Sequence, residues 1–256
     1  LPAQGAVGEL CAPRWRGPLT TVMLDLRNFD VISFDCYGTL IDWESGILDA
    51  LAPFREAGKL DVSDESLLAS FAMLEATLED GEYRRYREVL RGVMRGLATR
   101  YSVPEAKVDL DALASSLPSW QPFPDTVEAL QRLRAHYKLA IISNIDVDLF
   151  AGTAKHLNVE ISHLITAEQV GAYKPSQENF TLALQSMGIP RERLLHAAQS
   201  RFHDIAPARA LGISCVWVNR RGAKSGGGAT ARSAAVPDLE VPDLKTLADR
   251  VDAAFA

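Results

Sequence analysis

The chain has 256 residues, of which 47% are hydrophobic and 23% are charged, and its formal net charge at pH 7 is -6. This length suits one substantial core, or a core with a smaller inserted domain, and leaves little room for two independent full-size domains. No stretch is long and apolar enough to span a membrane, and a net negative charge disfavours a phosphate-backbone-binding surface, so neither a membrane nor nucleic acid is an expected partner.

The cysteines and the first residues bear on localisation. Cys11, Cys36 and Cys215 are an odd number at unrelated spacings, which is typical of reduced thiols in a cytoplasmic protein rather than of a disulfide framework. Residues 1–24 lack the charged start and apolar run of a secretory signal. We interpret them as an N-terminal extension, with Met23 as a candidate natural start.

The first predicted strand covers residues 29–34, a short apolar run that ends at Asp35 and is followed by Gly38. Such a run indicates a buried parallel strand that carries an acid at its carboxyl end, where open α/β sheets place their sites. Residues 47–117 instead show helical periodicity, with apolar residues spaced three and four apart and no strand signal.

Strand and helix signals then alternate to the end of the chain. Strands are predicted at 139–142, 163–166, 194–198 and 214–218, and helices at 126–136, 177–187, 204–211 and 244–255; residues 222–233, rich in Gly, Ser and Ala, are predicted to form a mobile loop. This rhythm predicts an α/β fold: a Rossmann-like parallel sheet with helices on both faces and an inserted helical cap subdomain. The expected division is an extension (1–24), an α/β core (25–46 and 119–256) and a cap (47–118).

Four elements with chemically active side chains follow predicted strands. They are the segment from Asp35 to Thr39, Ser143-Asn144, Lys174-Pro175 and the segment from Gln199 to Asp204. Parallel strands bring their carboxyl ends to one edge, so these elements should converge. An acid, a lysine that keeps it ionised, and hydroxyl and amide donors together favour nucleophilic catalysis by a carboxylate.

These elements resemble, in order and spacing, the four motifs of the haloacid dehalogenase superfamily. The resemblance rests on FDCYGTL at 34–40, ISN at 142–144, YKP at 173–175 and the Asp204 segment, and it extends from Phe29 to Asn219. In that superfamily the first Asp is the nucleophile and a helical cap follows the first motif. The resemblance therefore implies that Asp35 is the nucleophile.

Two departures favour one branch of the superfamily. Its phosphatases usually carry a second Asp two residues after the nucleophile, where this chain has Tyr37, and a Gly-Asp pair before the last helix, where it has Ala198-Gln199. Magnesium prefers several oxygen ligands, commonly carboxylates. Both departures are similar to the metal-independent 2-haloacid dehalogenases, so no metal and no cofactor is expected.

The resemblance also implies roles for the other motif residues. Lys174 would hold the Asp35 carboxylate, Asp204 would position Lys174 or a water, and Thr39, Ser143 and Asn144 would orient the nucleophile or the substrate carboxylate. Asp35 would displace halide from a short 2-haloalkanoic acid, and water would then hydrolyse the resulting aspartyl ester.

The remaining candidates are substrate-binding residues. The better-known dehalogenases receive the halide with an arginine early in the cap, but residues 64–82 contain none. The nearest candidates are Arg84, Arg85 and Arg87, of which we expect at most one to reach the site, and Arg201 could supply a cation from the other side. Further candidates for the pocket wall are Cys36, Tyr37, Trp43 and Phe202; for most of these, ordinary packing or a solvated surface is the competing interpretation.

Two other functions remain open. One is a magnesium-dependent phosphatase acting on a small phosphate monoester, which chelation would distinguish by abolishing turnover. The other is a non-catalytic binding protein on the same fold, which would leave Asp35 unlabelled after incubation in heavy-oxygen water. The expected partner is a small haloacid, and a homodimer is compatible with the resemblance because related enzymes often dimerise.

Overall fold

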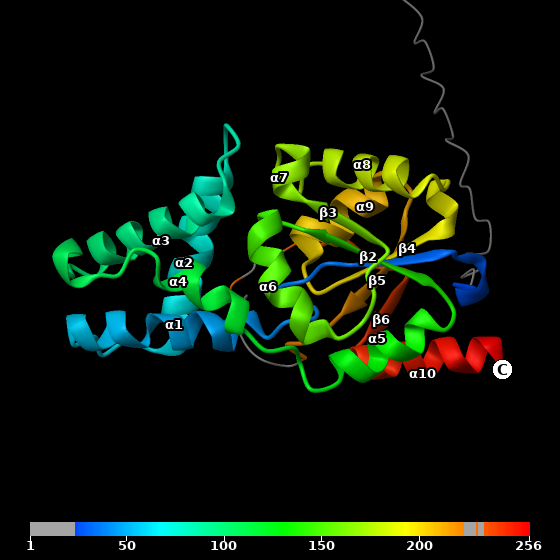
Figure 1. The fold of residues 1–256 in the computed structure, drawn as a ribbon, viewed down its shortest axis with the longest axis horizontal. Helices are drawn as coiled ribbons and strands as arrows, with labels where there is room; N and C mark the ends of the chain where they lie inside the picture. The colour runs from blue at the N-terminus through cyan, green and yellow to red at the C-terminus, as the bar shows by residue number, and fades with distance from the viewer. Residues whose placement is uncertain (1–23, 223–228, 230–232) are drawn as a thin grey trace, which may run out of the picture.

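A single parallel sheet forms the centre of the molecule (Figure 1). The structure, a computed structural model, describes residues 24–222, 229 and 233–256. Within them six strands pair in the order β3-β2-β1-β4-β5-β6, all parallel. The strands are β1 (Val31–Phe34), β2 (Lys138–Ser143), β3 (His163–Thr166), β4 (Leu194–Ala198), β5 (Ser214–Val218) and β6 (Leu239–Val241).

Helices cover both faces of the sheet, which confirms the predicted fold class (Figure 1). On one face lie α5 (Thr126–Arg134), α6 (Val147–Leu157) and α10 (Leu244–Phe255), and on the other lie α7 (Ala167–Val170), α8 (Glu178–Met187) and α9 (Ala206–Ala210). Each face has its own hydrophobic cluster. Because both faces are covered, every residue of β1 and of β4 is buried, and this is why these strands are mainly apolar, with Ser33 and His196 as the exceptions.

The predicted helical insertion forms a group of helices beside the sheet (Figure 1). It consists of α1 (Trp43–Gly58), α2 (Asp64–Glu79), α3 (Tyr86–Arg100), η2 (Glu105–Lys107), α4 (Ala112–Ser116) and η3 (Leu117–Ser119). We call these helices the cap. The α2 and α3 helices pack along their apolar stripes, which include Phe71 and Val93. The expected boundary between residues 46 and 47 lies inside α1, and the division into domains at the stated bounds stays a prediction.

Several elements differ from the sequence expectation. Helix α6 and strand β6 were not predicted, and the predicted helix at 204–211 begins earlier, with a π-helical turn, η5 (Arg201–Ile205), ahead of α9. The short turns η1 (Leu26–Asn28) and η4 (Arg191–Arg193) complete the described elements. The predicted extension, apart from Leu24, and most of the predicted loop at 222–233 lie outside the described residues. Among the described helices, none has the length and hydropathy to cross a bilayer.

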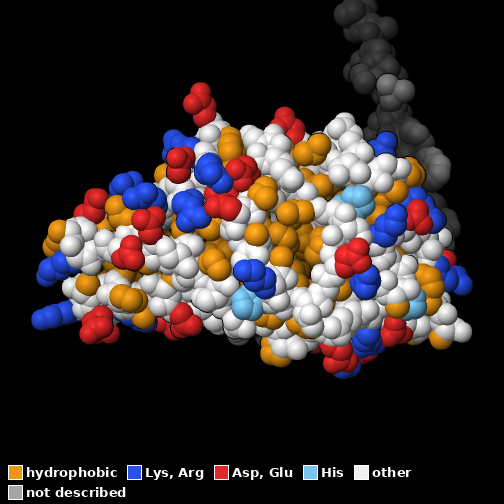
Figure 2. Space-filling view, in the orientation of Figure 1, with side chains coloured by type: hydrophobic (Ala, Val, Ile, Leu, Met, Phe, Trp, Pro, Cys, Tyr) orange, Lys and Arg blue, Asp and Glu red, His pale blue; other side chains and the backbone are white. Residues whose placement is uncertain are grey.

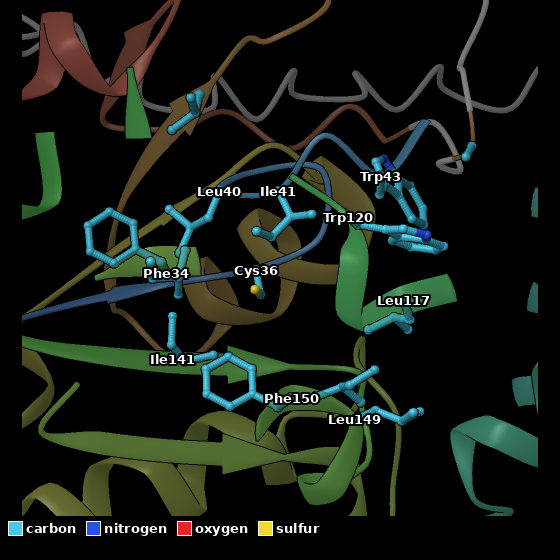
Figure 3. Packing of buried hydrophobic residues seen from close by; sticks show 14 of the residues in the cluster. Phe34, Cys36, Leu40, Ile41, Trp43, Leu117, Trp120, Ile141, Leu149 and Phe150 are labelled. Carbon is cyan, nitrogen blue, oxygen red and sulfur yellow. The ribbon is translucent and has the colours of Figure 1, made fainter. Parts of the chain in front are cut away.

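The core beneath the first motif fixes the position of Asp35. Phe34, Leu40 and Ile41 surround the end of β1 and are completely buried, together with Cys36 (Figure 3). Close packing of this kind leaves little freedom for the backbone that carries the acid. The carboxyl group is therefore held by the core from behind and faces the sheet edge in front.

Candidate active site

The carboxyl ends of three neighbouring strands meet at one pocket. Asp35 follows β1, Ser143 ends β2 and Ser200 follows β4, while Lys174 comes from the segment between α7 and α8. The pocket has about 450 Å³ of empty space. We call it the sheet-edge pocket, and it is lined by Asp35, Tyr37, Trp43, Glu75, Glu79, Tyr86, Ser143, Asn144, Lys174, Gln199, Ser200, His203 and Asp204.

A buried lysine joins two carboxylates at the base of the pocket. Lys174 Nζ lies 2.9 Å from Asp35 Oδ1 and 2.6 Å from Asp204 Oδ1, and it also donates to the Ile142 carbonyl oxygen at 2.9 Å. Lys174 and Asp204 are each 1% exposed and Asp35 is 8% exposed. Asp35 is therefore the most exposed of the three, and the structure brings together the three charged residues predicted from the sequence.

The two carboxylates differ in their electrostatic environment. Burial raises the pKa of Asp35, and the Lys174 ammonium opposes this shift. Burial acts in the same direction on Asp204, but Lys174 and a hydrogen bond from His196 hold the pKa of Asp204 below its usual value. Burial alone would lower the pKa of Lys174, yet the two carboxylates raise it to about 12. The lysine thus stays charged at neutral pH beside an acid that is costly to ionise.

The turn after β1 orients the Asp35 carboxylate. Thr39 Oγ1 donates to Asp35 Oδ2 at 2.9 Å and accepts from the Gln199 backbone N–H at 2.9 Å. Gly38 has a φ of 92°, and a Cβ there would lie 2.8 Å from Trp43 Nε1, so glycine is required for this turn. With Lys174 on one oxygen and Thr39 on the other, the carboxylate has a fixed direction.

The two residues predicted at the end of β2 have different surroundings. The Ser143 hydroxyl is buried and has no hydrogen-bond partner among the described residues. Asn144 binds the backbone of Lys174 in both directions, because its Oδ1 accepts from Lys174 N at 2.7 Å and its Nδ2 donates to Lys174 O at 3.1 Å. Asn144 therefore fixes the lysine segment to the sheet edge, and Ser143 offers an unused hydroxyl to the pocket.

A buried histidine supports Asp204 from behind. His196 Nε2 lies 3.1 Å from Asp204 Oδ1, and its Nδ1 lies 2.8 Å from Ser33 Oγ. A carboxylate only accepts, so Nε2 carries a proton and donates it to Asp204. His196 lies outside the set predicted from the sequence, although a histidine in a strand that otherwise holds only Leu and Ala is itself a signal.

We expect His196→Phe to reduce kcat about tenfold with little change in KM, because it removes the donor that holds Asp204 and, through it, Lys174. Loss of a hydrogen bond to a buried charge should also lower the free energy of unfolding by about 1.5–3 kcal/mol. Steady-state kinetics and denaturant unfolding check both values. The matched control is His163→Phe, a change at the start of β3 that is distant from Asp204 in the sheet order. Normal kcat in His196→Phe would contradict the role.

Of the other residues predicted to bind the substrate, some line the sheet-edge pocket and others lie elsewhere. Tyr37 and Trp43 line the pocket, and the Tyr37 hydroxyl lies 2.8 Å from Thr153 Oγ1. Cys36 is buried in the hydrophobic core (Figure 3). The Arg201 guanidinium stacks on Trp217, with 3.6 Å between Cζ and the ring centroid. Phe202 lines a neighbouring groove, which shares Glu79, Lys174 and His203 with the pocket.

The cap arginines bind the core rather than the pocket. Arg87 pairs with Asp148 at 3.1 Å, Arg85 pairs with Asp148 at 3.2 Å, and the Arg84 carbonyl oxygen accepts from the Tyr173 hydroxyl at 2.7 Å. Asp146 is completely buried and accepts from the backbone N–H groups of Tyr86 and Arg87. These contacts join the start of α3 to the segment after β2, and the structure does not bring Arg84 or Arg87 to the pocket.

The cap instead contributes acidic side chains that lie outside the predicted set. Glu75 and Glu79 line the pocket, and Tyr86 Oη donates to Glu75 Oε1 at 2.6 Å. The signal in the sequence is position: Glu75 follows Phe71 by four residues and is buried with it, and the partly exposed Glu79 follows Glu75 by four on the same side of α2. An acid on an apolar helix face is a candidate for a site.

The donor set of the pocket does not resemble a metal centre. Within the described ranges, no group of three or more His, Cys, Asp and Glu side chains is arranged to hold a metal ion. The Lys174 ammonium lies between the Asp35 and Asp204 carboxylates and binds both. The pocket therefore combines a directed carboxylate with a fixed positive charge at the edge of a parallel sheet, an arrangement that is suited to nucleophilic attack by the carboxylate.

Comparison with known proteins identifies the family. Residues 29–212 match the model of the haloacid dehalogenase-like hydrolases. The chain is 30% identical to the (S)-2-haloacid dehalogenase H-109 of Pseudomonas putida over 88% of its own length and 98% of that protein. It is 28% identical to the haloacetate dehalogenase H-2 of Moraxella sp. (strain B), over 77% and 88% of the two chains. The chain belongs to the haloacid dehalogenase-like hydrolase family.

Solved structures support the fold. The L-2-haloacid dehalogenase from Xanthobacter autotrophicus with chloropropionic acid covalently bound superposes with a TM-score of 0.71, at 21% identity, over 88% of this chain and 98% of that one. A defluorinating L-2-haloacid dehalogenase superposes with a TM-score of 0.75, at 21% identity, over 88% and 95%. At this identity the likeness establishes the shared fold alone.

Proposed function

We propose that this protein hydrolyses the carbon-halogen bond of short 2-haloalkanoic acids by way of an ester on Asp35. The curated relatives are named for 2-haloacids and haloacetate, which belong to this class. The observation that carries the proposal is the geometry of Asp35: Lys174 holds one carboxylate oxygen at 2.9 Å and Thr39 holds the other at 2.9 Å, at the base of a pocket of small volume.

The reaction needs two displacements. In the first, an Asp35 oxygen attacks the carbon that bears the halogen, the carbon-halogen bond breaks, and the halide leaves with the bonding pair. In the second, water attacks the Asp35 carbonyl carbon, the ester opens, and a 2-hydroxyacyl product and one proton are released. Attack at the Asp35 carbonyl carbon regenerates the carboxylate, so the enzyme is unchanged after one cycle.

The side chains supply what these steps require. Lys174 stabilises the ionised form of Asp35, which burial disfavours. Burial lowers the pKa of His203 to about 4, so this pocket residue is neutral at pH 7 and adds no charge to the site. Trp43 and Tyr37 supply apolar walls that limit bulk water around the departing halide.

The test is a single turnover of 2-chloropropionate in heavy-oxygen water with enzyme in excess. We expect the heavy oxygen on Asp35 and ordinary oxygen in the first product, because water attacks the aspartyl carbonyl carbon. Mass spectrometry of the peptide that contains Asp35 measures the label, and EDTA should leave halide release unchanged because Lys174 supplies the positive charge. Label in the product with none on Asp35 would refute the ester.

A further inference from the structure

Lys174 has no spare donor for a substrate anion. An ammonium group has three N–H donors, and those of Lys174 go to Asp35, to the Ile142 carbonyl oxygen and to Asp204. Among the described residues that line the sheet-edge pocket there is no arginine and no second lysine. A 2-haloalkanoate adds one more negative charge to this pocket, so the groups of the described wall that can bind its carboxylate are neutral donors.

The Ser143 hydroxyl and the Glu79 carboxyl group lie on the core side and the cap side of the pocket. Ser143 ends β2, and its hydroxyl is buried without a partner among the described residues. Glu79 ends α2, and its carboxyl group makes no ion pair or hydrogen bond with a described residue. A carboxyl group that keeps its proton has one O–H donor, whereas an ionised one only accepts. Glu79 can therefore bind a carboxylate, provided that it stays protonated.

The neighbour of Glu79 on α2 favours the protonated form. Glu75 lies one helical turn earlier on the same side of the helix, and Tyr86 Oη donates to its Oε1 at 2.6 Å. Burial raises the pKa of Glu75 to about 7, although this hydrogen bond favours its ionised form. Burial and the charge of Glu75 raise the pKa of Glu79 well above its usual value. Of two carboxyl groups that interact in this way one keeps its proton, and here it is Glu79.

The other charged groups around Glu79 do not reverse this order. Lys174 favours the ionised form of Glu79, but burial and Glu75 have the larger influence. The remaining titratable groups that line the pocket or the neighbouring groove are Asp35, Tyr37, Asp80, Tyr83, Tyr86, Tyr173, His203 and Asp204. Burial keeps the tyrosines and the histidine uncharged at pH 7, because it raises the pKa of each tyrosine and lowers that of the histidine. The aspartates, when ionised, are like charges that favour a neutral Glu79.

We propose that Glu79, as a carboxylic acid, donates its O–H to the substrate carboxylate and is the cap residue that recognises 2-haloalkanoic acids. The inference rests on the proposed function and deepens it, because it names a group that binds the anionic end of the substrate. The proton stays on Glu79 in this hydrogen bond, so no bond is made or broken there. Asp35 still displaces the halide, and water still opens the ester.

The first experiment measures kcat/KM for 2-chloropropionate by halide release from about pH 6 to about pH 10. The donor is lost as Glu79 ionises, so we expect kcat/KM to fall about tenfold per pH unit above the pKa of Glu79, mainly through a higher KM. In Glu79→Gln the amide keeps an N–H donor and cannot ionise, so this fall should disappear. In Glu79→Leu no donor remains, and kcat/KM on the low-pH side should be about tenfold lower than in Glu79→Gln.

A variant of Glu75 identifies which carboxyl group titrates. The charge of Glu75 raises the pKa of Glu79, so in Glu75→Gln the fall in kcat/KM should begin at a lower pH. If Glu75 itself were the donor, the fall would vanish in Glu75→Gln and persist in Glu79→Gln, and this result would overturn the inference. The two positions are tested separately, so misfolding at the buried Glu75 leaves the test at the partly exposed Glu79 intact.

The matched control is Glu82→Gln, which removes the same charge from an exposed residue between α2 and α3 that does not line the pocket. The fall in kcat/KM should keep its position in this variant. Two other results count against the inference: a kcat/KM that stays level across this pH range in the unchanged enzyme, and a fall that is the same in Glu79→Gln.

Binding without turnover separates failure of this inference from failure of the proposed function. Calorimetry with 2-chloropropionate and Asp35→Asn measures the affinity of the pocket without the nucleophile and without the titration of Asp35. We expect the affinity to decrease with rising pH, and to be independent of pH in the double variant Asp35→Asn, Glu79→Gln. If the unchanged enzyme releases no halide, the proposed function fails and this result alone decides the inference. Absence of binding, or an equal pH dependence in both variants, overturns it.

Discussion

Asp35→Asn should abolish halide release, with a loss in kcat on the order of 10⁶-fold, because an amide cannot act as the nucleophile. The fold should tolerate the change. Burial raises the pKa of Asp35, so above that pKa the folded state disfavours the ionised form, and removal of the charge should leave the melting temperature unchanged or raise it. Lys174 keeps Asp204 as a partner. Halide release and thermal unfolding measure the two effects.

The control for this variant is Asp30→Asn, which removes the same charge just before β1, at the opposite end of the strand. Asp30 pairs with Arg193 on the surface, where an ion pair contributes little to stability. Turnover should therefore be retained in Asp30→Asn. Appreciable turnover in Asp35→Asn, with no reversion of the side chain to Asp, would remove Asp35 from the mechanism.

Lys174→Met should reduce both activity and stability. Two buried carboxylates would then face each other without a cation, and breaking a buried ion pair in this way costs about 3–5 kcal/mol of the free energy of unfolding. The pKa of Asp35 should rise further, because the Lys174 charge is the main influence that opposes burial. The nucleophile must be ionised, so the acid limb of the kcat/KM profile reports the pKa of Asp35. In the unchanged protein this pKa is already above the usual aspartate value, and in Lys174→Met the acid limb should move to still higher pH.

The measurements are a pH profile of kcat/KM and chemical unfolding. Lys155→Met, an exposed position on α6, provides the same change of side chain without the buried contacts and should behave as the unchanged protein. An unshifted acid limb in Lys174→Met would show that the lysine does not control the ionisation of Asp35.

Much of the architecture could be predicted because the sheet imposes a simple pattern. The strands at 163–166, 194–198 and 214–218 have the predicted bounds, since strands buried on both faces must be short apolar runs. The convergence of Asp35, Lys174 and Asp204 could be predicted for the same reason, because parallel strands align their carboxyl ends. Strand β6 is three residues long, too short for a periodic signal.

The cap wall of the pocket could not be predicted in the same way. Helical periodicity indicates which face of α2 is buried, but whether a buried position faces α3 or the pocket depends on how the helices pack. Glu75 lies among apolar residues, whose periodicity alone indicates packing. The arginines at 84, 85 and 87 are a cluster of charges, which indicates a candidate anion site. Their partners, Asp146 and Asp148, lie about sixty residues away in sequence, and no local pattern connects them.

The contacts between Asp146 and the start of α3 affect which compounds can enter the sheet-edge pocket. Asp146 lies three residues after Ser143 and binds the backbone of Tyr86, whose hydroxyl holds Glu75. These contacts therefore fix the spacing between Glu75 and the Lys174 ammonium in the unliganded protein. The site then needs little further ordering when a ligand binds. Because the width of the sheet-edge pocket is fixed in this way, the enzyme should exclude bulky 2-halo compounds by size.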